Sequence, residues 1–487
     1  MQPGFRGPQK LAMVAPNVLR NVLWTIGQMD TTILLPLASF LVCFASYRLA
    51  RKKHAFNPVP LFLVVFCCYN ILPFLVMHFL PAPTELLLGS SSVYYGSESV
   101  SKIAWIVLAC SLAALTGQVI GTLPVPVRPY RRAHAGTGVY ARSNVKLLQA
   151  IFVMLFAAAL GVVWQLRGFL FSGYRAGFAV DMSEVVQRGT LSSSFTLLFV
   201  AYLFLWYIHR TQNNVAISRI AFRLNTLAVL TIAVCLLSLG GRLYVASAGL
   251  TFLTAASAFP VARPSSTSSS RPRVPQWVLL TLMAIGSSLV GVWRLGGVPS
   301  IAALLTNMIT EPLFVSISLA SLVALNRIPV LSLPNLLLGD AVGLLPATIF
   351  PDKIHRLFAI RQVFAVESPL GGLNGLASLI ANFGWLGAVY VILAISLCLT
   401  WISRMVGRGT GPRGLGKLTF IIGSTLPLLS LLRDPPVVSV YKYLLQNAIC
   451  WPLALAFLTR LRLFPKRVPR GMKDPSAKKS GVPEELA

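Results

Sequence analysis

The sequence contains few acidic residues and little charge of either sign. Of its 487 residues, 13 are Asp or Glu and 42 are Lys or Arg, and charged residues make up 11% of the chain. A soluble globular domain carries about 25% charged residues, so this composition argues against a soluble fold. With 55% hydrophobic residues and a mean hydropathy of +0.73, the chain is typical of an all-α polytopic membrane protein, in which each span needs about 20 mostly apolar residues.

The sequence also lacks the common signatures of cofactor and metal sites. Its seven cysteines all lie in apolar runs and show neither a disulfide framework nor the spacing of zinc ligands. We find no Walker A motif, no GxGxxG before a strand, no lipase-type GxSxG and no DxD pair. These absences argue against an ATP-driven process, and we expect no cofactor and no metal.

Long apolar runs predict about 11 transmembrane helices, within a range of about 10 to 13. Residues 1–30 lack the continuous apolar core of a signal peptide, and we expect them to form an interfacial helix or one further span. Residues 31–460 then form a single membrane domain, and 461–487 form a basic tail. The predicted spans are 31–48, 59–80, 102–122, 147–166, 192–209, 224–240, 243–259, 277–293, 376–400, 418–433 and 438–459.

The net charge of +29 is unevenly distributed along the chain. Alternate connecting segments and the tail hold 27 of the 42 Lys and Arg residues, and by the positive-inside rule these segments are cytoplasmic. Ten of the 13 acids lie in the other, outer segments, and the remaining three lie in the tail. The charge therefore indicates a topology with a cytoplasmic C-terminus, and we expect the phospholipid bilayer rather than nucleic acid as its partner.

Two outer loops, about 167–191 and 294–375, are long enough to carry function. The second contains two apolar stretches, 311–329 and 333–350, which are interrupted by proline or charge. Both stretches are short for spans, so we expect helices that lie in the membrane interface or cap a cavity.

Basic residues also gather on the outer side of this topology, where the positive-inside rule disfavours them. A guanidinium holds phosphate through two hydrogen bonds and does not deprotonate. The outer side therefore predicts an anionic, phosphorylated substrate that arrives from the lipid. These basic residues are Arg167, Arg175, Arg188, Arg242, Lys353, Arg356, Arg361, Arg433 and Lys442.

Several outer residues also have a purely structural interpretation. Arg242 follows a Gly-Gly turn between two predicted spans, so it either binds substrate or donates to free carbonyls of the preceding helix. Arg167 ends a span, and its side chain can simply extend to the interface. Arg433 and Asp434 either form an ion pair at the turn before two prolines or act on substrate. His355 is either a general acid or base, or a loop residue.

The order of the outer motifs resembles that of the Wzy-type O-antigen polymerases, which polymerise oligosaccharide repeat units in bacterial inner membranes. The resemblance covers roughly residues 59–460 and rests on the order of features rather than on a strict signature. The features are a GYR loop (Gly173–Arg175), a GGR turn (Gly240–Arg242), Glu311 before an apolar helix, the stretch Leu345–Lys353, the segment GGLNGLASLIANFGWLG (371–387), Arg433-Asp434, and the YKY stretch Tyr441–Tyr443.

The resemblance implies a membrane glycosyltransferase of the GT-C class that acts on the outer, periplasmic face. Such an enzyme transfers a growing glycan from undecaprenyl pyrophosphate onto a new lipid-linked repeat unit, for O-antigen, capsule or exopolysaccharide. The resemblance also implies two protein partners from the same pathway, a chain-length regulator and a flippase.

The candidate residues suit this chemistry, because the leaving pyrophosphate develops negative charge that fixed arginines can stabilise. We expect Arg242, Arg361 and Arg433 to hold the pyrophosphate. The acceptor hydroxyl needs a base, for which the candidates are Asp434, Glu367 and His355. The further substrate-binding candidates are Arg175 and Arg188 for phosphates or acidic sugars, Tyr174, Tyr441 and Tyr443 for stacking on sugar faces, and Lys353 and Lys442.

Two other functions remain open at the level of sequence. An O-antigen ligase also has a large outer loop with Arg and His, but its acceptor is lipid A–core rather than another lipid-linked repeat unit. A flippase or solute transporter is expected to have broken helices, two related halves and cations within its membrane core. The outer position of the cations favours the polymerase.

Overall fold

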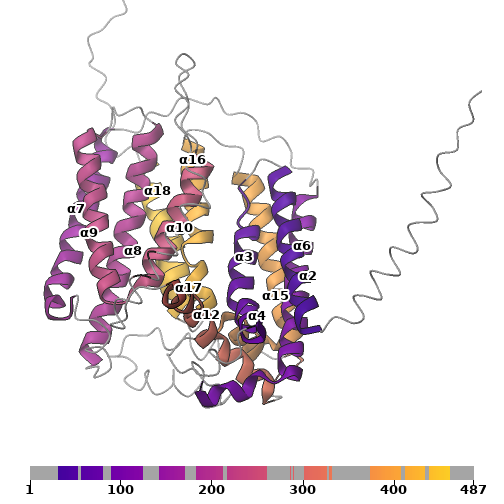
Figure 1. Cartoon of the computed structure of the whole chain (residues 1–487). Helices are drawn as coiled ribbons and strands as arrows, with labels where there is room; N and C mark the ends of the chain where they lie inside the picture. The colour runs from indigo at the N-terminus through magenta and orange to yellow at the C-terminus, as the bar shows by residue number, and fades with distance from the viewer. Residues whose placement is uncertain are drawn as a thin grey trace, which may run out of the picture.

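The computed structural model describes residues 31–52, 56–79, 89–123, 142–170, 182–211, 217–259, 286, 289, 301–325, 328, 330–331, 373–406, 412–433 and 438–460. Every element in these ranges is a helix, and the helices form a bundle (Figure 1). The helices are α2 (Thr31–Lys52), α3 (Val59–Asn70), α4 (Leu72–Phe79), η1 (Gly89–Tyr95), α6 (Ser97–Thr122), α7 (Arg142–Gln165), η2 (Arg167–Phe169), α8 (Met182–Thr211), α9 (Arg219–Ser238), α10 (Arg242–Ala258), α12 (Ile301–Ala324), α15 (Gly375–Val406), α16 (Pro412–Thr425), α17 (Leu428–Arg433), η4 (Val438–Cys450) and α18 (Trp451–Arg460).

Within the described residues, seven helices are long and apolar enough to cross a membrane, which confirms the prediction of a helical membrane protein. Three other predicted spans, 59–80, 243–259 and 438–459, are present as shorter helices. The predicted span 277–293 and the apolar stretch 333–350 lie outside the described residues, apart from Gly286 and Leu289. The seven candidate spans are Ile33–Ala50, Ser97–Thr122, Asn144–Gln165, Gly189–Thr211, Arg219–Ser238, Gly375–Val406 and Gly414–Arg433.

Some helix boundaries differ from the predicted ones. Helix α8 begins at Met182, inside the predicted loop 167–191, and α12 begins at Ile301, ten residues before the predicted start at 311. The predicted span 59–80 is interrupted between α3 and α4. The interruption precedes Pro73, which has no N–H to donate to the carbonyl one turn earlier in the chain.

Helix α15 is also broken, although the sequence predicts one continuous span at 376–400. Gly384 has a φ of 78° and a ψ of 169°, which is not helical and favours glycine. Val330 and Leu331, which follow α12, lie against this break, and the N–H of Leu386 donates to the carbonyl of Val330 at 3.2 Å. Helix α15 thus has a first part, 375–383, and a second part, 385–406.

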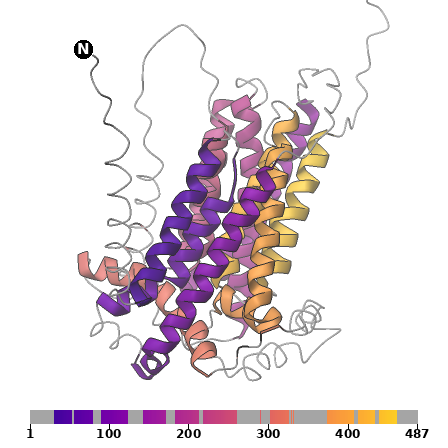
Figure 2. The same ribbon diagram turned by 90° about the vertical axis from the view of Figure 1, so that its right-hand side faces the viewer.

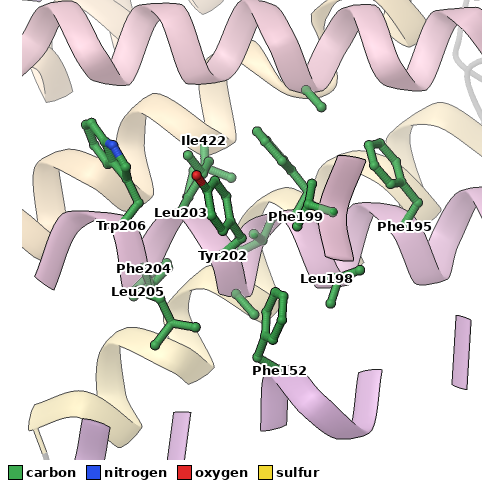
Figure 3. Close-up of a cluster of buried hydrophobic side chains, with 14 of the residues drawn as sticks. Phe152, Phe195, Leu198, Phe199, Tyr202, Leu203, Phe204, Leu205, Trp206 and Ile422 are labelled. Carbon is green, nitrogen blue, oxygen red and sulfur yellow. The ribbon is translucent and has the colours of Figure 1, made fainter. Parts of the chain in front are cut away.

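The buried apolar side chains form two main clusters. One joins α7, α8, α9, α10, α16 and α18, and the other joins α2, α3, α6, α12 and α15; the two groups lie side by side in Figure 1. Helix α8 is the most enclosed of the candidate spans, with 83% of its apolar window buried. Its aromatic residues lie between Phe152 of α7 and Ile422 of α16 (Figure 3).

Helices α6 and α15 run parallel to each other. Gly117 of α6 lies against Ser396 of α15, and one turn later Gly121 lies against Thr400. Small residues at an interface let two membrane helices approach closely. The residue numbers of α6 and α15 rise together along the contact, so the two helices run in the same direction. The predicted topology requires this direction.

One end of the bundle collects cations that bind helix C-terminal carbonyls. Arg404 donates to the carbonyl of Gly121 at 2.9 Å, and Lys417 donates to that of Ala258 at 2.9 Å. These carbonyls end α6 and α10, where the helix dipole is negative, so the cations stabilise both helix ends. We call this the basic end and the other the distal end; α12 lies toward the distal end (Figures 1 and 2). The basic end also holds Arg48, Arg210 and Arg219.

Candidate functional site

The structure describes the side chains of three predicted site residues, Arg242, Arg433 and Tyr443. The backbones of three others are described, at Arg188 in α8 and at Tyr441 and Lys442 in η4, but their side chains are not. The remaining predicted site residues, Tyr174, Arg175, Lys353, His355, Arg361, Glu367 and Asp434, lie outside the described residues.

Arg242 is the first residue of α10, directly after the turn that the sequence predicts. Gly240 in this turn has a φ of 93°, in the left-handed region that favours glycine. The N–H of Gly240 donates to Leu237 at 3.0 Å, and the N–H of Gly241 donates to Leu236 at 2.8 Å. Backbone N–H groups of the turn therefore bind the carbonyls of Leu236 and Leu237 at the end of α9.

The position of Arg242 at the start of α10 has an electrostatic consequence. The N-terminus of a helix carries partial positive charge, and a cation there is disfavoured by about 0.3–1 kcal/mol. Arg242 is half-buried and is the first residue of α10, at this end of the dipole. An anion bound beside it would interact favourably with both the guanidinium and the helix N-terminus.

Arg433 ends α17 and lies at the same end of the bundle as Arg242. Helix α16 runs antiparallel to α10, since Lys417 bonds to Ala258 and Thr425 bonds to Thr251 at 3.0 Å. Continuing this register by two turns places the end of α17 beside the first turn of α10, and the two helices are neighbours in Figure 1. The fold therefore brings Arg242 and Arg433 to one region of the distal end.

A tyrosine pair joins the same region to η4. Tyr443 is buried, and its ring stacks on that of Tyr244 in α10, with centroids 5.1 Å apart and an interplanar angle of 25°. Tyr443 is one of the predicted site residues, whereas Tyr244 is not, and the only signal for Tyr244 in the sequence is its position two residues after Arg242. Because one face of Tyr443 packs on Tyr244, this ring holds η4 against the start of α10.

We expect the tyrosine pair to stabilise the distal end measurably. Aromatic stacking contributes about 0.5–1.5 kcal/mol beyond buried area. Tyr244→Leu and Tyr443→Leu should each lower the melting temperature in detergent, and the double variant should lose less than the sum of the two. Strictly additive losses would show that the rings do not interact.

The first turn of α15 also reaches this region. Asn374 precedes the helix, and its Oδ1 accepts hydrogen bonds from the N–H groups of Leu376 at 2.8 Å and Ala377 at 3.3 Å. Gly375 lies directly against the backbone of Leu431 and Leu432 in α17, where a Cβ atom would overlap it. The start of α15 is thus fixed next to Arg433.

Arg167 is also remote from the basic end but sits in a different environment. Its guanidinium lies 4.4 Å from the ring centroid of Trp164, whose side chain is 67% exposed. Arg and Trp are common anchors at a membrane interface. This geometry agrees with the structural interpretation of Arg167.

The described part of the distal region offers two cationic residues, Arg242 and Arg433, and the tyrosine pair. Within the described ranges, no group of three His, Cys, Asp or Glu side chains could hold a metal ion. Comparison with protein-family models, curated proteins and solved structures gave no significant match. The chain is a helical membrane protein with an arginine-bearing region at one end of its bundle.

Proposed function

We propose that this protein polymerises oligosaccharide repeat units linked to undecaprenyl pyrophosphate, on the periplasmic face of a bacterial inner membrane. The resemblance of its ordered motifs to Wzy-type polymerases suggests the reaction. The observation that carries the proposal is the shared location of Arg242 and Arg433 at the end opposite to the basic end. The positive-inside rule makes the basic end cytoplasmic, so the arginines face the periplasmic leaflet.

The chemistry requires stabilisation of a leaving group. As the acceptor hydroxyl attacks the anomeric carbon, the glycosidic bond to phosphate breaks and the pyrophosphate takes the electron pair. Two guanidiniums held on different helices can bind its oxygens through paired hydrogen bonds. Arg242 also benefits from the dipole of α10, which favours an anion at the same place.

The broken helix α15 favours a second candidate, a flippase for lipid-linked oligosaccharides. Discontinuous helices in transporters place half-helix ends at substrate and ion sites. Helix α15 is discontinuous in this way, because Gly384 is not helical and the carbonyl of Val330 accepts a hydrogen bond from Leu386 just after the break. Against it stands the charge pattern, because the described arginines of α10 and α17 lie at helix ends rather than in mid-span.

Deletion of the gene separates the candidates on a gel of surface polysaccharide. A polymerase deletion should leave a single repeat unit on the acceptor, because the flippase and ligase still work. A flippase or ligase deletion should leave unmodified core. Full-length chains in the deletion strain would contradict the proposal.

A further inference from the structure

The side-chain amide of Asn374 is buried, and among the described residues only its oxygen atom has hydrogen-bond partners. Its side chain is fully buried, and its Nδ2 has no hydrogen-bond partner within the described part of the chain. Its backbone N–H donates to Ser318 Oγ of α12 at 2.8 Å, so the residue is firmly held. A buried donor without a partner costs about 1–3 kcal/mol, and such groups are rare in native proteins.

The orientation of this amide is fixed by the helix that it caps. Oδ1 accepts two backbone N–H groups, from Leu376 and Ala377. Exchanging the oxygen and nitrogen would point the NH₂ at these donors, so the capping bonds settle the assignment. Since the amide is planar, Nδ2 points away from α15.

The surroundings favour a negatively charged oxygen as the missing partner. Asn374 begins a half-helix, 375–383, whose N-terminus is the positive end of its dipole. Its neighbour Gly375 touches α17 immediately before Arg433. Among the acids with described side chains, only Glu98 is present, and it is paired with Lys102 at 2.7 Å.

We propose that Asn374 binds the diphosphate group of a polyprenyl-linked substrate, with Nδ2 donating a hydrogen bond to a phosphate oxygen and Arg433 supplying charge from α17. This inference rests on the proposed function and assigns that site a binding residue. Asn374 lies in the segment 371–387, which is one of the features that resemble the Wzy-type polymerases. The Asn374 amide is an uncharged hydrogen-bond donor. A cationic donor at this position would be repelled by the positive N-terminus of α15.

Two substitutions separate this role from the capping role. Asn374→Ser and Asn374→Asp both keep an oxygen that can cap α15, because Ser, Asp and Asn are all good N-cap residues. Both lack the amide donor, and Asp also adds negative charge. The probes are farnesyl diphosphate, inorganic pyrophosphate and farnesol, with binding to the purified full-length protein measured by calorimetry in detergent.

The expected result is an ordered loss of affinity for farnesyl diphosphate. Asn374→Ser should bind it about tenfold more weakly, as for one lost hydrogen bond to a charged group, and Asn374→Asp should bind more weakly still. Farnesol binding should not change in either variant. Inorganic pyrophosphate should show the same order among the variants but bind more weakly than farnesyl diphosphate, because it lacks the prenyl chain. Equal affinity for pyrophosphate and farnesyl diphosphate would contradict a lipid-linked ligand.

Asn382 provides the matched control, since it is buried in the same helix and its Nδ2 donates to Ser378 at 2.9 Å. Asn382→Ser should leave the affinity unchanged. Wild-type affinity in Asn374→Ser, or tighter binding in Asn374→Asp than in Asn374→Ser, would overturn the inference, as would a wild-type protein that does not bind farnesyl diphosphate. If Asn374→Asp does not fold, the Ser variant decides. The polysaccharide gel tests the polymerase separately, so either idea can fail alone.

Discussion

Replacing Arg242 by alanine is expected to reduce polymer formation by about 100-fold or more, the usual effect of removing one group that stabilises developing negative charge. Arg242→Lys should retain part of the activity, because it keeps the charge but not the paired hydrogen bonds. Polymer amount and length on a gel, from the deletion strain carrying each variant, provide the measurement.

Arg167→Ala is the control for this experiment. Arg167 is also remote from the basic end, but it lies over the exposed ring of Trp164. Its removal should leave polymer formation unchanged, which separates a specific role of Arg242 from a general loss of positive charge. If both Arg242→Ala and Arg242→Lys make wild-type polymer, the assigned role of Arg242 is wrong.

Gly375→Val should destabilise the distal end by about 3 kcal/mol, at the upper part of the range for overpacking. A Cβ at this position overlaps the backbone of Leu431 and Leu432, and neither backbone can move as a flexible side chain can. The start of α15 must then separate from α17, which displaces Arg433. We expect both a lower melting temperature in detergent and a loss of polymer.

The matched control for Gly375→Val is Gly416→Val. Gly416 lies in α16, and a Cβ there meets no atom within 4 Å. This variant should change the free energy of unfolding by less than about 1 kcal/mol, the scale of helix propensity differences, and so leave the melting temperature nearly unchanged. Equal melting temperatures for the two variants would show that α15 and α17 are not in close backbone contact.

Much of the architecture could be predicted from local patterns in the sequence. Apolar runs of span length predicted the seven candidate membrane helices, because burial in lipid requires about 20 apolar residues in succession. The Gly-Gly turn before Arg242 was predicted for a similar reason, since two glycines between apolar runs allow a sharp reversal. The Lys- and Arg-rich connecting segments were expected on one side of the membrane, and this expectation indicated which helix ends lie at the same end of the bundle.

The features that depend on tertiary contacts could not be predicted in this way. The break of α15 at Gly384 arises because Val330 and Leu331, more than 50 residues earlier, lie against it. The pairing of Tyr244 with Tyr443 joins helices far apart in the chain. The free amide of Asn374 is visible only once its oxygen is seen to cap α15.

The most direct test of the central claim is reconstitution of the purified protein in liposomes with lipid-linked repeat units isolated from the deletion strain. A polymerase should convert these units into glycans of several repeats and release one undecaprenyl pyrophosphate for each new linkage. Arg242→Ala protein should do so about 100-fold more slowly. Repeat units that stay single and lipid-linked with the wild-type protein, or that only cross the bilayer, would contradict the account.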